Sequence, residues 1–226
     1  MLVGILMCGH VPDDYRARRG DLDHLFRDML AGHGFDFRTW SVVDMEFPDS
    51  AADADAWLVT GSKHGVYEDL PFIAPLEDLV RDIYAAKRPL VGVCFGHQII
   101  AQALGGRVEK WRGGWHTGLQ RYDMRGREIA LNAWHQDQVV DLPPEAEVLA
   151  SNDTCPFAAL RYGQTTWSVQ AHPEFEREYM EILIDTRAGQ VPAANRAHAQ
   201  AHLSDPTDRD AITAEIVAVL QQKVSV

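Results

Sequence analysis

This sequence has few cysteines, no cluster of basic residues and no long apolar run. Its three cysteines, Cys8, Cys94 and Cys155, form no C-x-x-C pair. An odd, scattered set of cysteines argues against a disulfide framework, a zinc ribbon or a thioredoxin-type site, and favours a reducing compartment. No apolar run reaches the length of a membrane span, and Met1 leads into a short apolar stretch without a basic leader region. We therefore expect a cytoplasmic protein that does not bind membranes.

The charge balance is acidic. The chain has 21 Lys and Arg residues against 33 Asp and Glu residues, which gives a formal net charge of −12 with neutral histidines. Nucleic acids and anionic lipids attract basic surfaces, so we expect neither as a partner. The residue pattern also predicts no metal ion and no cofactor, and the expected partner is a small-molecule substrate.

Length and composition predict one globular unit. With 226 residues, 46% hydrophobic and 24% charged, the chain can bury a full core as one α/β domain or as two small ones. No stretch has the composition of a linker and no internal repeat is visible. We therefore expect a single domain over residues 1–226.

The first half of the chain alternates between strand and helix patterns. Continuous apolar runs predict buried strands, and apolar residues at helical spacing predict amphipathic helices. This alternation predicts an α/β fold with a three-layer, open, mostly parallel sheet and helices on both faces. The expected elements are a strand at 2–7, a loop at 8–20, a helix at 22–30, strands at 35–43 and 56–60, a helix at 76–84, a strand ending at Val93 and a helix from His97.

After Gly105 and Gly106 the pattern changes to short strands separated by glycine, proline and asparagine. This texture indicates antiparallel hairpins added to one edge of the sheet. The expected strands are 107–111, 119–124, 128–131, 139–142, 147–150, 157–161 and 166–170. A helix at 178–187, a stretch without a clear apolar stripe at 188–206 and a last helix at 212–220 complete the chain.

Cys94 occupies a predicted turn between strand and helix, in Gly92-Val93-Cys94-Phe95-Gly96. Glycines two positions before and after it permit a crowded turn that lifts a side chain above the sheet edge, as in the G-x-S-x-G nucleophile elbow. The N-terminus of the following helix favours a thiolate over a thiol. The alternative is a small buried thiol that closes a strand, because free cysteines are usually in the core.

A candidate base and its orienting carboxylate follow the last predicted strand. His172 and Glu174 are two positions apart, so in an extended chain they face the same side, and Pro173 stiffens the link. A nucleophilic cysteine needs such a pair to accept its proton. For each residue taken by itself there is a simpler alternative: a surface histidine for His172, and a carboxylate in the first turn of the following helix for Glu174. However, Cys94 and Thr60-Gly61-Ser62 also follow strands, and the carboxyl ends of parallel strands share one edge.

Together these blocks resemble the class I glutamine amidotransferase family. Gly92 to Gln98 is followed by Gln170-Ala171-His172-Pro173-Glu174 in the order and at the separation typical of that family. Thr60-Gly61-Ser62 corresponds to the family's glycine-rich oxyanion turn. The resemblance extends from the first strand to the helix after Glu174, and it implies a flavodoxin-like version of the predicted fold.

The resemblance implies a role for each matching residue. Cys94 would be the nucleophile, His172 the general base and then acid, and Glu174 the group that orients His172. Attack on a γ-carboxamide would give a γ-glutamyl thioester and ammonia, and water would then release glutamate. The remaining matches are the oxyanion-hole residues Phe95, Gly61 and Ser62, and the substrate-binding residues Gln98, Trp115 and Gly118. Core packing is the alternative for Trp115.

Departures from the family pattern leave several functions open. Members that supply ammonia to synthetases usually have two glycines and a proline in the oxyanion turn, where this chain has Ser62 and Lys63. We expect no synthetase domain to follow, as in the stand-alone, GMP-synthase-like subgroup that includes γ-glutamyl peptidases. We expect hydrolysis of the amide of L-glutamine, with or without a separate synthetase subunit. The alternatives are a γ-glutamyl peptidase without an ammonia acceptor and a non-catalytic regulatory or binding subunit.

Other reactive side chains have simpler expected roles. His97 follows Cys94 by three positions on the helix, so its side chain should point away into packing. Cys8 and Cys155 are expected to be buried thiols. His135 and Asp137 are expected to lie in a solvated loop.

Overall fold

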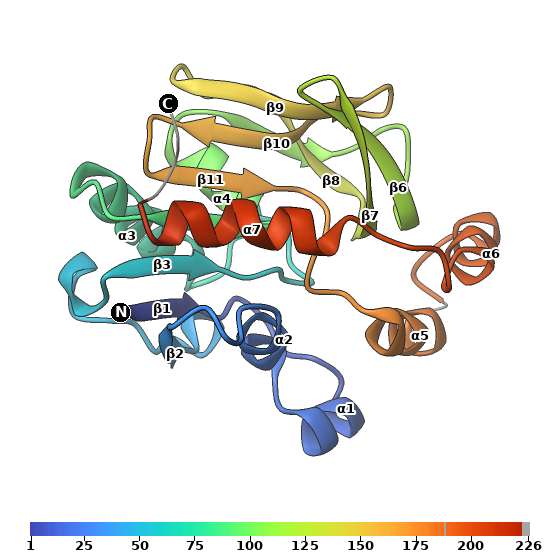
Figure 1. The fold of residues 1–226 in the computed structure, drawn as a ribbon, viewed down its shortest axis with the longest axis horizontal. Helices are drawn as coiled ribbons and strands as arrows, with labels where there is room; N and C mark the ends of the chain where they lie inside the picture. Colours follow the sequence, from blue (N-terminus) through green and yellow to red (C-terminus); the bar gives the residue numbers. More distant parts are fainter. Residues whose placement is uncertain (188, 223–226) are drawn as a thin grey trace.

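A nine-stranded mixed sheet runs through the molecule in the order β2-β1-β3-β4-β11-β10-β9-β6-β7 (Figure 1). This computed structural model describes residues 1–187 and 189–222. Strands β2, β1, β3, β4 and β11 are parallel, and the sheet continues through antiparallel pairs to β7. Strands β5 and β8 form a separate antiparallel pair. The predicted α/β sheet with an added antiparallel region is confirmed.

The central strands of the parallel half are short and buried. β3 and β4 are buried at every position, as their continuous apolar runs predict for strands covered on both faces. β11 is also buried at every position, although it includes Thr166 and Ser168. The strands are β1 (Leu2–Leu6), β2 (Asp36–Trp40), β3 (Ala56–Val59), β4 (Leu90–Val93), β5 (Arg107–Lys110), β6 (His116–Met124), β7 (Arg127–His135), β8 (Asp137–Asp141), β9 (Ala146–Asn152), β10 (Cys155–Tyr162) and β11 (Thr166–Val169).

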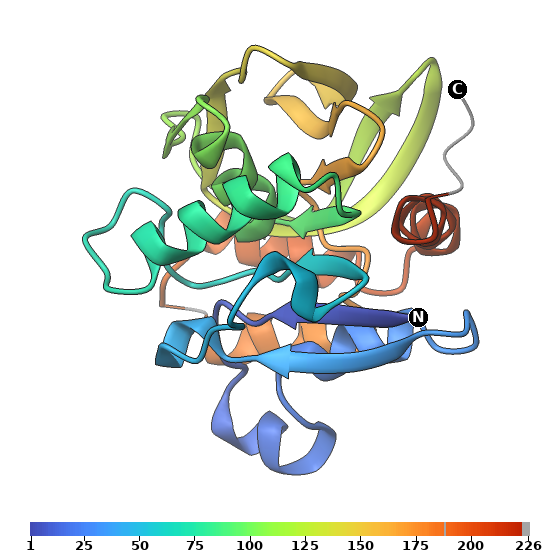
Figure 2. The same cartoon turned by 90° about the vertical axis from the view of Figure 1, so that its left-hand side faces the viewer.

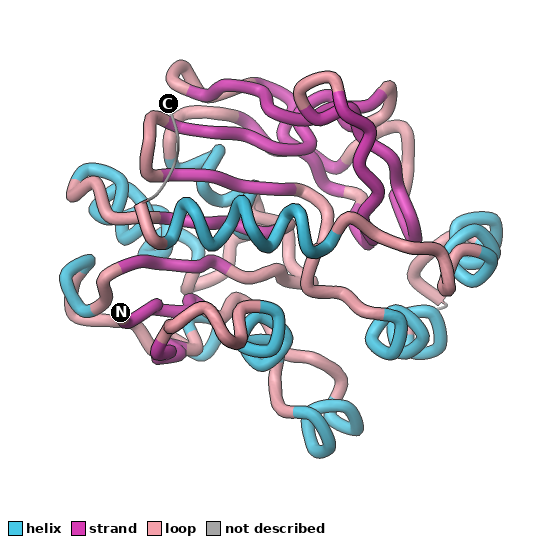
Figure 3. The backbone as a smooth tube through the Cα atoms, viewed as in Figure 1, coloured by secondary structure: helices cyan, strands magenta, loops and turns pink. Residues whose placement is uncertain are grey.

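Helices cover both faces of the parallel strands and make three layers (Figure 2). Helix α7 packs on β4 and β11 from one face, and α4 packs on β3, β4 and β11 from the other, beside α3. Helices α5 and α6 lie beyond one end of the strands (Figure 3). The helices are α1 (Asp13–Arg19), α2 (Leu22–Met29), α3 (Ile73–Ala85), α4 (Phe95–Ala103), α5 (Arg177–Thr186), α6 (Ala193–Ala201) and α7 (Arg209–Leu220).

The sequence prediction was wrong at several element boundaries. The expected loop 8–20 contains helix α1, and the unassigned stretch 188–206 contains α6. Tyr15 is the only buried residue of α1 and Ala199 the only one of α6, so neither helix has an apolar stripe. Helix α4 begins at Phe95 rather than at His97, and β2 ends at Trp40, before a 3₁₀ turn at Val42–Asp44.

The turn after β4 depends on two glycines. A Cβ on Gly92 would overlap the carbonyl group of Gly96, and a Cβ on Gly96 would overlap the carbonyl oxygen of Val59 at the end of β3. These contacts confirm the crowding that the G-x-C-x-G spacing predicts. They let the first turn of α4 lie directly against two neighbouring strands.

We expect Gly96→Ala to lower the free energy of unfolding by about 1–3 kcal/mol, because overpacking against a backbone atom is relieved only by moving α4 or β3. Chemical denaturation followed by circular dichroism measures the change. Gly189→Ala is the matched control, because a Cβ at Gly189 meets no atom within 4 Å. Equal stabilities of the two variants would contradict the packing argument.

No helix among the described residues is both long and apolar enough to cross a membrane. The single-domain organisation expected for residues 1–226 stays a prediction.

Candidate active site

A cavity of about 230 Å³ opens at the carboxyl ends of the parallel strands. It is lined by Gly61 and Ser62 after β3, Cys94 after β4, and His172 after β11. These strands are neighbours in the sheet order β3-β4-β11, so residues far apart in the sequence converge on one edge. Pockets for small molecules typically span about 300–1,000 Å³, which makes this cavity suitable for a compact ligand.

Cys94 lies at the apex of the turn between β4 and α4. Its backbone has φ 54° and ψ −104°, a conformation that non-glycine residues rarely adopt. The hydrogen bond from Cys94 N to the Val169 carbonyl oxygen, 2.8 Å, anchors the turn to β11. Strained backbone at such a turn is typical of functional sites. Cys94 lines the cavity at the N-terminus of α4, where the positive end of the helix dipole favours an anion.

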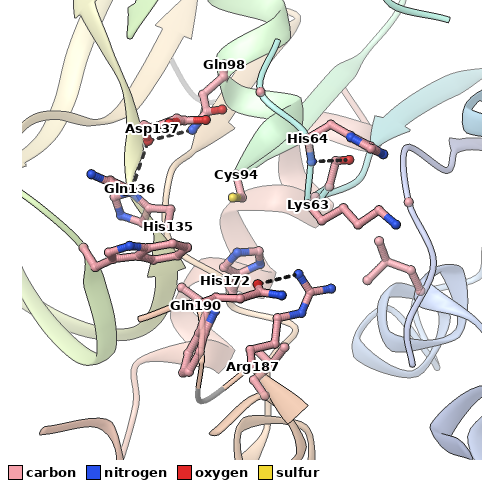
Figure 4. Close-up of a pocket in the computed structure, with 18 of the residues that line it drawn as sticks. Lys63, His64, Cys94, Gln98, His135, Gln136, Asp137, His172, Arg187 and Gln190 are labelled. Atoms are coloured by element: carbon pink, nitrogen blue, oxygen red, sulfur yellow. Dashed lines mark hydrogen bonds between the residues drawn. The ribbon is translucent and has the colours of Figure 1, made fainter. Parts of the chain in front are cut away.

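His172 lies beside Cys94 in the cavity (Figure 4) and forms a buried pair with Glu174. His172 Nδ1 donates to Glu174 Oε1 at 2.7 Å, and the two residues are 4% and 1% exposed. Phe175 stacks on the His172 ring with a centroid separation of 3.7 Å. Burial by itself lowers the pKa of His172, but the Glu174 carboxylate and the Cys94 sulfur outweigh burial and raise the pKa to about 10. The imidazole is therefore held as an imidazolium at neutral pH.

The turn after β3 lies close to His172 and Cys94. A Cβ on Gly61 would lie 3.1 Å from His172 Cε1 and 3.8 Å from Cys94 Cβ. The buried Thr60 hydroxyl donates to the Gly61 carbonyl oxygen at 3.0 Å and accepts from Cys8 N at 3.0 Å. The Gly61–Ser62 peptide thus has its carbonyl turned toward buried Thr60. In a trans peptide the N–H points the opposite way, so the Ser62 N–H faces away from Thr60.

One side of the cavity is acidic and amide-rich. Gln98 Nε2 donates to the Asp137 carbonyl oxygen at 2.8 Å and to Gln170 Oε1 at 3.1 Å, which leaves Gln98 Oε1 for a ligand. Asp137 Oδ1 accepts from the Tyr67 hydroxyl at 3.0 Å. Burial raises the pKa of the Asp137 carboxyl above its ordinary value, although Tyr67 and Lys110 act in the other direction. Gln98 was predicted as a site residue, and Asp137 was not.

The expectation of a solvated loop for His135 and Asp137 was wrong. His135 ends β7, is 4% exposed, and lines the cavity, as does the half-buried Asp137 at the start of β8. Burial lowers the pKa of His135 well below its ordinary value, and the nearby His116 and His172 lower it further. The signal available in the sequence was the H-x-D spacing between two strand patterns.

Two predicted substrate residues have different positions. Trp115 lines the cavity and also packs on the apolar core, so both of its expected roles are compatible with its position. Gly118 has φ 71° and lies against α6, because a Cβ there would lie 2.5 Å from Ala199 Cα. Its visible role is to let β6 and α6 approach closely. Its expected role in substrate binding stays a prediction.

Helix α5 supplies a cavity wall that the sequence analysis did not include. Tyr179, Leu183 and Arg187 follow one another at four-residue spacing, so they lie on one face of the helix and its C-cap, and Gln190 adjoins them. In Figure 4, Gln98 and Asp137 lie on one side of Cys94, and Arg187 and Gln190 lie on the other.

The other candidate nucleophiles and bases are buried away from the cavity. His97 is fully buried with Nδ1 2.8 Å from Ser168 Oγ, and burial lowers its pKa to about 3. Burial raises the pKa of the Cys155 thiol to about 12 and that of the Cys8 thiol further. The expectations for these three residues are confirmed. Among residues 1–187 and 189–222, no group of three or more His, Cys, Asp or Glu side chains could hold a metal ion.

Residues 37–184 match the family described as glutamine amidotransferase class-I. Gamma-glutamyl peptidase 3 of Arabidopsis thaliana is 27% identical over 183 residues, which cover 74% of each chain. A GMP synthase [glutamine-hydrolyzing] of Porphyromonas gingivalis is 32% identical over 139 residues, 57% of this chain and 26% of that protein. The crystal structure of a glutamine amidotransferase from Methylobacillus flagellatus superposes with a TM-score of 0.78 at 20% identity, covering 98% of this chain and 92% of the other.

The match to the family spans well over half of the chain, and the solved structure shares the fold of the sheet and helices described above. The family resemblance seen in the sequence motifs is therefore confirmed. This chain belongs to the class I glutamine amidotransferase family.

Proposed function

We propose that this protein hydrolyses γ-glutamyl amide bonds through a γ-glutamyl thioester on Cys94, with L-glutamine as the simplest substrate. The observation that carries the proposal is that Cys94 and His172 line one cavity at the ends of β4 and β11, while Glu174 holds the Nδ1 atom of His172. A nucleophile, a base and an orienting carboxylate are the parts that acyl transfer requires. Membership of the family and the likeness to a γ-glutamyl peptidase support the same reaction class.

The two halves of the reaction add up to the hydrolysis of one amide bond. The Cys94 sulfur attacks the γ-carbonyl carbon and forms a C–S bond, and the C–N bond breaks as His172 gives its proton to the leaving nitrogen. The neutral imidazole then accepts a proton from water while the water oxygen attacks the thioester carbon. The C–S bond breaks, glutamate leaves, and the imidazolium forms again. Glu174 holds Nδ1 throughout, so that Nε2 exchanges the proton.

The oxyanion formed in each half of the reaction needs two donors. The Phe95 N–H is at the first position of α4, where a backbone N–H has no acceptor within its own helix. The Gly61–Ser62 peptide is oriented by Thr60 so that the Ser62 N–H points away from the buried hydroxyl. We assign these two N–H groups to the oxyanion hole. Removing one such donor typically costs about 2.7–4 kcal/mol of transition-state stabilisation.

The acidic side of the cavity suits the α-ammonium group of a γ-glutamyl substrate. The Asp137 carboxylate and Gln98 Oε1 provide acceptor oxygens there, and Trp115 provides an apolar surface. The scissile bond then lies between this side and His172. Gly118 contributes to substrate binding on this side indirectly, because it lets β6 pack closely against α6.

Two physiological settings fit this chemistry. In one, ammonia from L-glutamine passes to a separate synthetase subunit, as the likeness to a part of GMP synthase suggests. In the other, the protein cleaves γ-glutamyl peptides without an ammonia acceptor, as the likeness to gamma-glutamyl peptidase 3 suggests. A cytoplasmic location fits both settings.

A substrate panel tests the proposal. Purified protein should release glutamate from L-glutamine, from γ-glutamyl dipeptides or from both, with ammonia measured in parallel. Added hydroxylamine should divert part of the glutamate into γ-glutamyl hydroxamate, because it captures the thioester in competition with water. Glutamate release without any hydroxamate would contradict the thioester. No release from any member of the panel would instead support a regulatory or binding subunit.

A further inference from the structure

The wall formed by α5 lies on the side of Cys94 where the leaving group must go. In the proposed reaction His172 protonates the leaving nitrogen, so the rest of the leaving group extends past His172. Phe175 stacks on His172, and the Tyr179 ring packs on Phe175 with a centroid separation of 4.6 Å. The cavity therefore continues from His172 along α5.

This wall is apolar along most of its length and ends in a cation. Tyr179 and Leu183 are buried side chains of α5 that line the cavity, and Arg187 lies one turn further on. Eight residues of helix rise about 12 Å. An extended chain spans at most about 3.3–3.6 Å per residue, so a leaving group of one or two amino-acid residues fits along the wall.

Arg187 has no acidic partner on this wall. Its Nη1 donates to the amide oxygen of Gln190 at 3.4 Å. Within the described part of the chain, no carboxylate forms an ion pair with Arg187, whereas Arg19 and Arg177 on neighbouring surfaces pair with Glu178 and Glu181. A half-buried guanidinium that lines a cavity and has no carboxylate partner of its own is suited to bind one from a ligand, because its planar fork matches the two oxygens.

We propose that Arg187 binds the free carboxylate of the leaving group, and that the preferred substrates are γ-glutamyl amino acids or γ-glutamyl dipeptides. The inference rests on the proposed hydrolysis of γ-glutamyl amides and narrows its substrate class. The acidic side of the cavity receives the γ-glutamyl α-ammonium group, and the α5 wall receives a carboxylate of the other product. L-Glutamine, whose leaving group is ammonia, makes no contact with Arg187.

The experiment compares three substrates that differ only beyond the scissile bond: γ-glutamyl-leucine, γ-glutamyl-leucinamide and an uncharged γ-glutamyl anilide. Wild-type protein should prefer the free carboxylate. Arg187→Gln should lower kcat/KM for γ-glutamyl-leucine by about 10- to 100-fold, mainly through KM, since a hydrogen bond to a charged group is lost. Turnover of the leucinamide and the anilide should change by less than about 2-fold, since neither has the carboxylate.

Arg187→Lys should restore part of the preference, and Arg18→Gln on the exposed face of α1 should leave all three substrates unchanged. If wild-type protein cleaves the acid and the amide equally, or if Arg187→Gln affects all three substrates alike, the role of Arg187 is overturned while the proposed hydrolysis stands. If wild-type protein releases glutamate neither from these three substrates nor from L-glutamine, both proposals are overturned.

Discussion

Cys94→Ala should reduce glutamate release from every γ-glutamyl substrate by a factor on the order of 10⁴–10⁶, because loss of a nucleophile removes the covalent route altogether. The variant should stay folded, since alanine keeps the Cβ and removes only the sulfur at the cavity floor. Binding should persist, because Asp137 and Gln98 on the acidic side of the cavity are untouched. Steady-state assays of glutamate and a thermal unfolding curve measure the two effects.

Cys155→Ala is the matched control, because Cys155 is 1% exposed and is not among the residues lining the cavity. Its activity should equal that of the wild type. Brief treatment with iodoacetamide should label Cys94 in the wild type and nothing in Cys94→Ala, since burial raises the pKa of the Cys8 and Cys155 thiols and keeps them protonated. Substantial turnover by Cys94→Ala would overturn the assignment of the nucleophile.

The parallel core could be predicted from the sequence because its signals are local. β1, β3 and β4 are apolar runs that bury nearly every residue, and such runs have few alternatives in a chain of this composition. Cys94, His172 and Glu174 could be predicted for a related reason. Cys94 directly follows β4, and His172 and Glu174 come within a few residues of the end of β11, so the shared edge of a parallel sheet brings them together without any knowledge of side-chain packing.

Helices α1 and α6 could not be predicted because they bury little apolar surface. Each has a single buried residue, and hydrophobic periodicity gives no signal for such a helix. Helix α6 packs on β6 through contacts that depend on Gly118, and this pairing joins residues far apart in the sequence. The same limit applies to the cavity wall of α5. Its periodicity predicts a buried face, but only the tertiary structure shows that Arg187 extends this face into the cavity.

Glu174→Gln has the second large expected effect, and its cause is the charge of Glu174 rather than its shape. Glutamine has nearly the same shape and can still accept a hydrogen bond from His172 Nδ1. It provides no negative charge, however, and in a buried site that charge is what favours the imidazolium. The amide nitrogen of glutamine also permits the opposite orientation, which selects the wrong tautomer of His172. We expect kcat to fall by a factor of about 10²–10⁴.

The pH dependence distinguishes this electrostatic role from a packing role. In the wild type the pKa of His172 is raised to about 10, so the proton that the leaving group needs is present at neutral pH and is lost only as the pH rises through that value. In Glu174→Gln the negative charge that opposes the effect of burial is gone, so the pKa of His172 falls. The alkaline limb of kcat/KM should therefore move to lower pH by about 1–3 units. The control is Glu176→Gln, an exposed carboxylate two residues further on that pairs with Arg209. Its pH profile should match the wild type. An alkaline limb that stays in place in Glu174→Gln would show that Glu174 does not set the charge of His172.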